Sequence, residues 1–282
     1  MGSMHFPSGS LSCDVRLPLA VPLGVGTAAT IVARYDATVE AARGAAVLVH
    51  GLTDAPYSMR HLAGFYRDAG FHVVAPRMPG HGTTPGGLTK AVWPQWMAAL
   101  EVAIRRAQAQ AGPEAPLHLV GYSNGGALVT LHALEALADP AMAAPDRLVL
   151  VSPMIGVTRF ARFAGVAGWP AALPGFLRAA WFDLIPEFNP FKYNSFPVHA
   201  AVQTHRLTRA LQAELEAARR SGRMAAMPPV LAFQSVVDAT VSTRAVVDEL
   251  FARLPGNGSE LVLADLNRAA TLAPVLSAAA QA

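Results

Sequence analysis

Short apolar runs alternate with amphipathic stretches along most of the chain. The run AAVLVHG at 45–51 is continuously apolar and ends in glycine, which is typical of a β-strand buried on both faces. The stretch that follows predicts a helix that stops at Gly70. Its apolar face is expected to consist of Met59, Leu62, Phe65 and Tyr66. This pair of patterns, a strand followed by a helix, is the unit that the rest of the chain repeats.

The repetition predicts a mostly parallel sheet flanked by helices. Further strands are expected at 71–76, 117–121, 147–153, 228–238 and 260–266, and helices at 94–110, 124–137 and 243–253. Strands that alternate with helices pair in parallel through right-handed crossovers, so the fold class is α/β. Two further β-type stretches, at 13–19 and 29–35, are broken by Gly and Pro and predict an antiparallel edge.

The alternation breaks between residues 158 and 226. Ten of the chain's 21 aromatic residues fall within 158–200, and a leucine stripe then marks a helix that ends at Gly222. We interpret 158–226 as a helical cap inserted over the carboxyl-terminal edge of the sheet, where open α/β sheets bind ligands. The core would then consist of 1–157 and 227–282.

Composition excludes several classes of protein. A chain that is 52% hydrophobic and 15% charged can bury a large core, and a net charge of +3 without a Lys/Arg stripe gives no support for a nucleic-acid partner. Cys13 is the single cysteine, so no intrachain disulfide can form. No signal peptide or transmembrane run is visible, and a cytoplasmic location is expected. Metal and nucleotide motifs are missing, so we expect no cofactor.

The stretch Gly121-Tyr122-Ser123-Asn124-Gly125 matches G-x-S-x-G between a predicted strand and a predicted helix. A serine on so sharp a turn has a strained backbone, and glycines two residues before and after it avoid collisions. The helix that begins at Asn124 would direct its N–H groups and its dipole at an oxyanion. Ser123 is therefore the candidate nucleophile, against the alternative of a structural serine in a glycine-rich turn.

Four stretches give the chain a resemblance to α/β-hydrolases of the monoacylglycerol-lipase, lysophospholipase and carboxylesterase branch. They are VLVHGLT at 47–53, PRMPGHGTTP at 76–85, GYSNGG at 121–126 and QSVVDATV at 234–241. The resemblance covers about 44–157 and 228–265, and the aromatic segment between them corresponds in place to the family's cap.

The resemblance implies a role for each matched residue. His50-Gly51-Leu52 matches the loop whose Leu52 N–H, together with that of Asn124, would form the oxyanion hole. His50 and His81 would be structural. Asp238 matches the acid that orients a histidine, although a turn-capping aspartate is the alternative. The implied activity is hydrolysis of a carboxylic ester through an acyl-serine on Ser123, with thioester, amide or peptide bonds as variants. The aromatic cap favours an ester with an apolar acyl chain, against the alternative that its aromatic residues only pack the cap onto the sheet.

The family's histidine follows the acid in chain order, yet no histidine follows Asp238 here. The loop that should carry it reads Leu266-Asn267-Arg268-Ala269-Ala270. Three explanations remain, in order of preference: the chain continues beyond this sequence, the protein is a non-catalytic relative that binds a ligand or partner, or another histidine substitutes. The substitutes considered are His205, His199 and His81. The oligomeric state is not indicated.

Overall fold

The computed structural model describes residues 32–35, 42–82, 84–156, 180–189, 191–236, 238 and 241–264. The predicted β-stretch at 13–19, much of the predicted cap (158–179) and the predicted histidine loop at 266–270 lie outside the described residues.

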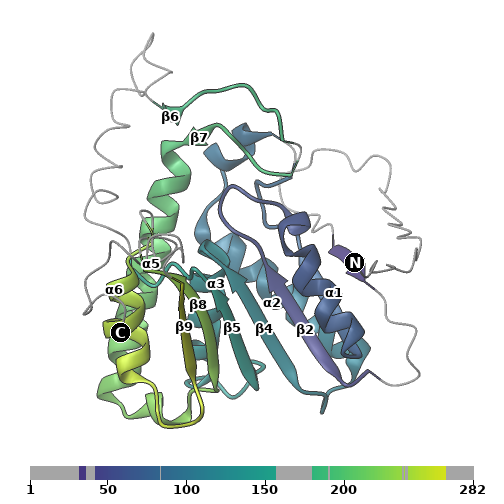
Figure 1. The fold of residues 1–282 in the computed structure, drawn as a ribbon, viewed down its shortest axis with the longest axis vertical. Coiled ribbons are helices and arrows are strands. Elements are labelled where there is room, and N and C mark those ends of the chain that lie inside the picture. Colours follow the sequence, from purple (N-terminus) through teal and green to yellow (C-terminus); the bar gives the residue numbers. More distant parts are fainter. Residues whose placement is uncertain are drawn as a thin grey trace, which may run out of the picture.

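A seven-stranded sheet forms the centre of the molecule (Figure 1). In spatial order its strands are β1 (Val32–Tyr35), β3 (Phe71–Pro76), β2 (Gly44–Val49), β4 (Leu117–Tyr122), β5 (Arg147–Val151), β8 (Val230–Ser235) and β9 (Glu260–Ala264). Only β1 is antiparallel to its neighbour. The predicted α/β class and the antiparallel edge formed by the stretch 29–35 are therefore confirmed.

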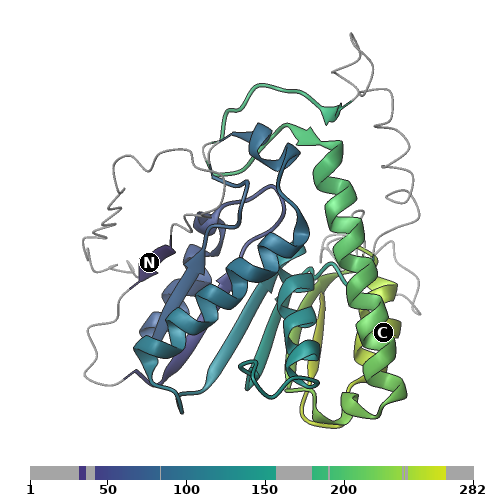
Figure 2. The same cartoon turned by 180° about the vertical axis from the view of Figure 1, so that it is seen from behind.

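Helices cover both faces of the sheet because strand side chains alternate between them. The helices are α1 (Arg60–Asp68), α2 (Trp93–Ala111), α3 (Asn124–Ala136) and α5 (Val198–Arg220), with short helices η1 (Pro56–Met59), η2 (Pro85–Thr89) and η6 (Arg223–Ala226). Ala46 and Leu48 pack under α1, whereas Val47 and Val49 belong to the larger core beneath α2, α3 and α5. Figures 1 and 2 show these two layers from opposite sides.

One prediction for the first helix was wrong. Phe65 does not join the apolar face of α1, since it is 73% exposed, whereas Met59 is buried and Leu62 and Tyr66 pack on the smaller core. At 100° per residue, Phe65 lies a quarter-turn beyond Tyr66, which turns its ring towards solvent. Helical spacing already separates these two positions, and the prediction grouped Phe65 with the apolar face because its side chain is aromatic.

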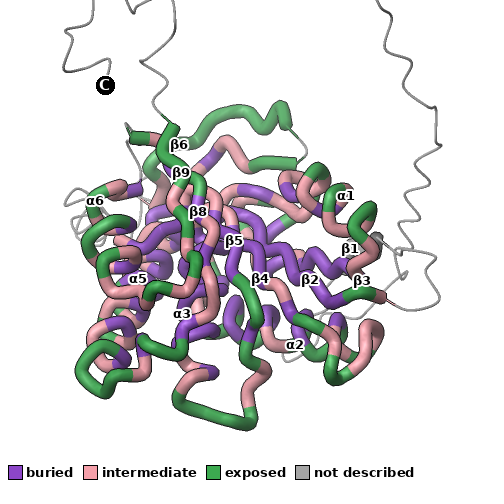
Figure 3. Tube along the Cα trace, turned by 60° about the horizontal axis from the view of Figure 1, so that its bottom comes forward, coloured by how far each residue is buried: buried purple, intermediate pink, exposed green. Residues whose placement is uncertain are grey.

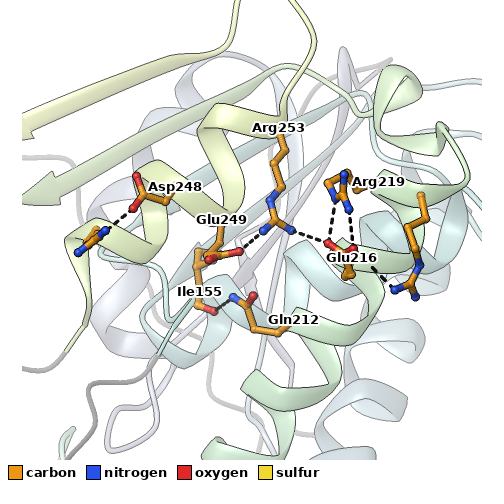
Figure 4. A network of polar contacts seen from close by, with 9 residues as sticks. Ile155, Gln212, Glu216, Arg219, Asp248, Glu249 and Arg253 are labelled. Atoms are coloured by element: carbon orange, nitrogen blue, oxygen red, sulfur yellow. Dashed lines mark hydrogen bonds and ion pairs between the residues drawn. The ribbon is translucent and has the colours of Figure 1, made fainter.

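The predicted helix at 243–253 is helical throughout but changes its winding. It begins as α6 (Thr243–Ala245), continues as the π-helical turn η7 (Val246–Leu250) and ends as the short 3-10 helix η8 (Phe251–Arg253). Figure 4 shows its polar contacts with α5: Arg253 pairs with Glu249 of its own helix and with Glu216 of α5. The ion pair between Arg253 and Glu216 thus connects the helix at 243–253 to α5.

The described part of the predicted cap divides in two. A short antiparallel pair, β6 (Trp181–Asp183) and β7 (Phe196–Pro197), lies beyond the carboxyl ends of the central strands (Figure 1). The leucine stripe of α5, at Leu207, Leu211 and Leu215, instead packs in the main core together with α3. Figure 3 shows burial concentrated in β2, β4 and β5, with the β6 segment largely exposed. The assignment of 158–226 as one cap stays a prediction.

Candidate active site

Ser123 occupies the turn between β4 and α3 at the carboxyl edge of the sheet. Its backbone has φ 52° and ψ −114°, and Ser152 is the other non-glycine residue with positive φ among those described. The turn is fixed by a bond from the Ser123 N–H to the Val151 carbonyl at 2.9 Å, and Met154 donates to the Ser123 carbonyl at 3.0 Å. A non-glycine residue held in this region costs about 1–3 kcal/mol, and such residues cluster at functional sites.

The two motif glycines are required by close backbone approaches. A Cβ on Gly121 would lie 2.5 Å from the carbonyl oxygen of Gly125, and a Cβ on Gly125 would lie 2.2 Å from the carbonyl oxygen of Val49. The start of α3, at Gly125, therefore packs directly against the end of β2, at Val49. The chain that leaves β2 therefore passes beside the amino end of α3, which is where an oxyanion hole would need it.

The two predicted oxyanion donors come from that junction. Leu52 sits in a turn closed by a 3.2 Å bond from the Asp54 N–H to the Gly51 carbonyl, and its own N–H donates to no acceptor among the described residues. Asn124 opens α3, so its N–H belongs to the helix's first turn, which has no intrahelical acceptor. Both amides are available to a ligand oxygen, and their catalytic role stays a prediction.

Two buried histidines hold this loop. The His50 ring contacts the Gly51 carbonyl through Nδ1 at 2.8 Å, and its Nε2 accepts the Met78 N–H at 3.2 Å. The His81 Nε2 lies 2.7 Å from the Leu52 carbonyl oxygen. Burial lowers the pKa of His50 to about 3, and burial likewise lowers the pKa of His81. Both therefore stay neutral in the folded protein near neutral pH.

Asp238 lies in the loop after β8, as predicted. Its Oδ1 accepts the Val241 N–H at 2.9 Å, and the buried Gln234 amide lies 3.4 Å from Oδ2. Gln234 also donates to the Thr243 hydroxyl at 3.2 Å, which joins β8 to the start of α6. The carboxylate caps its own turn, and this contact is compatible with both the catalytic and the turn-capping interpretation.

The candidate substitute histidines differ in their surroundings. His199 and His81 each have Nε2 within hydrogen-bonding distance of a backbone carbonyl, that of Ala91 at 3.0 Å and that of Leu52 at 2.7 Å. His205 lies on α5 immediately after Thr204, whose hydroxyl donates to the Asn124 side chain at 3.1 Å. Of the three, His205 thus adjoins a residue that contacts the serine turn directly.

Sequence reasoning missed the contact between the 191–193 segment and the loop at 51–54. The Tyr193 N–H donates to the Thr53 carbonyl at 2.7 Å, and Lys192 forms an isolated antiparallel bridge with Asp54. Burial raises the pKa of Asp54, and Lys192 partly opposes that shift. No local sequence pattern predicts this pairing, because the partners are far apart in sequence and come into contact only in the folded chain.

The same edge of the sheet carries further acidic and phenolic groups. The pKa of Tyr122 is raised by burial and then by the charges of Asp54 and Asp238, so this phenol stays protonated near neutral pH. Within the described ranges, no group of three His, Cys, Asp or Glu side chains is arranged to hold a metal ion. The helices of those ranges include none with the length and apolar character needed to cross a bilayer.

A family model for "Serine aminopeptidase, S33" matches residues 40–265, which include the turn at Ser123, the loop at 51–54 and Asp238. The chain belongs to this α/β-hydrolase family. The family resemblance inferred from the four sequence stretches is thereby confirmed, and the matched range ends just after β9.

Known lipases are among the relatives of this S33 member. A thermostable monoacylglycerol lipase of Bacillus sp. (strain H-257) is 31% identical over 175 residues, which make up 60% of this chain and 64% of that protein. The monoacylglycerol lipase of Paleococcus ferrophilus superimposes with a TM-score of 0.61 at 20% identity, over 84% of this chain and 89% of that one. A soluble variant of Saccharomyces cerevisiae monoglyceride lipase gives 0.61 at 15% identity, over 86% and 84%. These two structures show a shared fold.

Proposed function

We propose that this S33 family member is a serine hydrolase that cleaves carboxylic esters with apolar acyl chains through an acyl-serine on Ser123. The observation that carries the proposal is the strained backbone of Ser123 at the junction of β4 and α3, with φ 52°. A backbone held in this way presents the hydroxyl at the edge of the sheet. The relationship to monoacylglycerol lipases supports the ester substrate.

In the proposed reaction, the Ser123 oxygen attacks the ester carbonyl carbon while a base takes its proton. The Leu52 and Asn124 N–H groups donate to the resulting oxyanion, and collapse of the intermediate expels the alcohol, which receives that proton. Water then attacks the acyl-serine by the same route and releases the acid. Asp238 would orient the base and stabilise its protonated form.

Two altered chains would identify the base. His205, the substitute favoured from the sequence, is the first described histidine to test, by His205→Ala. An extension of the reading frame beyond Ala282 tests a histidine supplied by additional sequence. Restored or increased turnover in the extended chain, with no effect of His205→Ala, would assign the base to the extension.

The apolar acyl chain is inferred from the segment that lies over the carboxyl edge of the sheet. Its exposed apolar side chains are Phe182, Leu184, Ile185, Phe188 and Phe191. Tyr57 of η1 stacks on Phe191 with ring centroids 3.7 Å apart, which attaches this segment to η1. A lipophilic chain would find apolar partners there, whereas a charged substrate would not.

The decisive measurement is hydrolysis of p-nitrophenyl butyrate and octanoate by the chain and by Ser123→Ala. We expect serine-dependent turnover with a preference for octanoate, and amino-acid p-nitroanilides should be poor substrates. Faster cleavage of the anilides would instead favour the aminopeptidase chemistry in the family's description. A preference for butyrate would contradict the apolar acyl chain.

A second candidate function, ligand or partner binding without catalysis, is favoured by the lack of any histidine after Asp238. A fluorophosphonate probe separates the two functions, because it labels an activated serine and leaves an inactive one unmodified. Labelling that disappears in Ser123→Ala would exclude the non-catalytic interpretation. A cytoplasmic location stays a prediction from the sequence, which cell fractionation would test.

A further inference from the structure

We propose that His50 is a positioning residue that aims the Leu52 N–H at the oxyanion, through its hydrogen bond to the carbonyl of Gly51. The inference rests on the proposed function, because it assigns the means by which one of the two oxyanion donors is held. His50 touches no substrate in this scheme and acts through the peptide group alone.

The protonation state of His50 follows from its two partners. The Met78 N–H can only donate, so Nε2 of His50, 3.2 Å away, must carry a lone pair. In the neutral imidazole the hydrogen then sits on Nδ1, which donates to the Gly51 carbonyl oxygen at 2.8 Å. The ring is buried, with 1% of its surface exposed, so water cannot compete for either bond.

The Gly51 carbonyl and the Leu52 N–H belong to the same peptide group. No cis peptide bond occurs among the described residues, so these two groups point in opposite directions within one plane. A donor that fixes the carbonyl direction therefore fixes the N–H direction as well. A hydrogen bond to the carbonyl also polarises the peptide and strengthens its N–H as a donor.

The neighbouring peptide is held in the same way by His81. Its Nε2 lies 2.7 Å from the Leu52 carbonyl, while its ring lies 4.8 Å from that of His50 and stacks on Tyr193 at 6.4 Å. Both carbonyls that flank the Leu52 amide thus contact a buried imidazole. The Asp54 N–H also reaches the Gly51 oxygen, at 3.2 Å, so loss of His50 should loosen the turn without opening it.

Two substitutions of His50 separate positioning from a purely structural role. Asn places an amide N–H close to the position of Nδ1 and can still donate to Gly51, whereas Gln places its amide at the position of Nε2 and serves only Met78. The control is His132→Gln, because His132 is also buried, contacts the Ala143 carbonyl through Nε2 at 2.9 Å and sits in α3 away from the loop.

We expect His50→Gln to lower kcat by about 30- to 100-fold with KM within about threefold, since a misdirected oxyanion donor acts on the transition state. His50→Asn should keep most of kcat, and His132→Gln should leave it unchanged. The reverse order, with Gln active and Asn impaired, would overturn the proposal, as would equal losses in His50→Gln and His132→Gln.

The Leu52 amide resonance supplies a readout that needs no turnover. In a 1H–15N spectrum we expect it to shift further in His50→Gln than in His50→Asn, since both variants lose the imidazole ring but only Asn keeps the donor to Gly51, and to stay near its original position in His132→Gln. Equal shifts in the two His50 variants would overturn the positioning role. If the parent chain shows no Ser123-dependent hydrolysis, the proposed function fails, and this resonance alone decides the positioning role. An unshifted Leu52 amide in His50→Gln would overturn it.

Discussion

The turn at Ser123 leaves no room for a single additional carbon atom at Gly125. A Cβ on Gly125 would lie 2.2 Å from the Val49 carbonyl oxygen and 2.8 Å from that of His50, and backbone atoms cannot move aside cheaply. We therefore expect Gly125→Ala to lower the free energy of unfolding by at least about 2 kcal/mol in urea titrations. The matched control is Gly64→Ala in α1, where nothing lies within 4 Å and a gain of about 0.5–1 kcal/mol is expected. Equal effects at the two sites would contradict this packing.

Asp238 offers a residue-scale test that separates its two interpretations. Asn can keep an oxygen for the Val241 N–H, now at 2.9 Å, but it lacks the charge that would stabilise a protonated base. In a chain with Ser123-dependent turnover, we expect Asp238→Asn to lower kcat by about 10³-fold or more, with the unfolding free energy within about 1 kcal/mol of the parent's. Full activity in this variant would assign Asp238 to turn capping alone.

The sequence predicted the conformation of individual residues where the local backbone is sterically constrained. G-x-S-x-G predicted the sharp turn at Ser123, because only glycine tolerates the contacts found at 121 and 125. It could not predict that Thr204 contacts Asn124 or that Tyr193 donates to Thr53, since these partners lie on elements brought together by the fold. The role proposed for His50 depends on which ring nitrogen faces which carbonyl, and that is decided in three dimensions.

At the scale of elements, α5 is connected to the serine turn through one polar contact. Thr204→Val removes the hydroxyl that donates to the Asn124 Oδ1 and leaves that buried oxygen without its described donor. We expect a loss of about 1–3 kcal/mol in unfolding free energy, measured in urea, and a lower kcat. Thr208→Val is the matched control on the same helix, because its hydroxyl donates within α5, to the Thr204 carbonyl at 2.9 Å. A loss no larger than that of the control would refute the coupling of α5 to Asn124.

Strands and helices were predicted well where the apolar period was continuous. The buried runs of β2, β3, β4 and β5 are apolar over most of their length, so their positions followed from the sequence. The sequence did not predict where α5 packs, because a leucine stripe is equally compatible with a helix of a cap and with a helix of the core. The contact of that stripe with α3 is a property of the assembled fold.

At the scale of the whole molecule, burial shifts the pKa values of several side chains, and the sequence alone does not predict these shifts. Burial lowers the pKa of His50, His81, His118 and His132, whereas burial raises the pKa of Asp54 and Glu135. Which side chains end up buried depends on the complete packing, so no local pattern could have predicted the balance. As the pH falls, the four histidines lower the free energy of unfolding and the two carboxyls raise it. The effect of the histidines begins at a higher pH.

The pH dependence of stability follows from the sign of these shifts. A histidine whose pKa is depressed in the folded state binds fewer protons there than in the unfolded chain, so its stabilising effect is present above pH 6.5 and is lost as the pH falls towards its folded pKa. For His50, with a folded pKa of about 3, the loss between about pH 7 and pH 5 amounts to about 2 kcal/mol. We expect urea titrations of the parent to show a decline of about this size, and His50→Asn to reduce it by a similar amount. Thr208→Val removes no titratable group and should keep the parent's slope. A pH slope in His50→Asn equal to that of the parent would mean that His50 does not become protonated on unfolding in this range, and would remove the basis for its neutral, carbonyl-bound state.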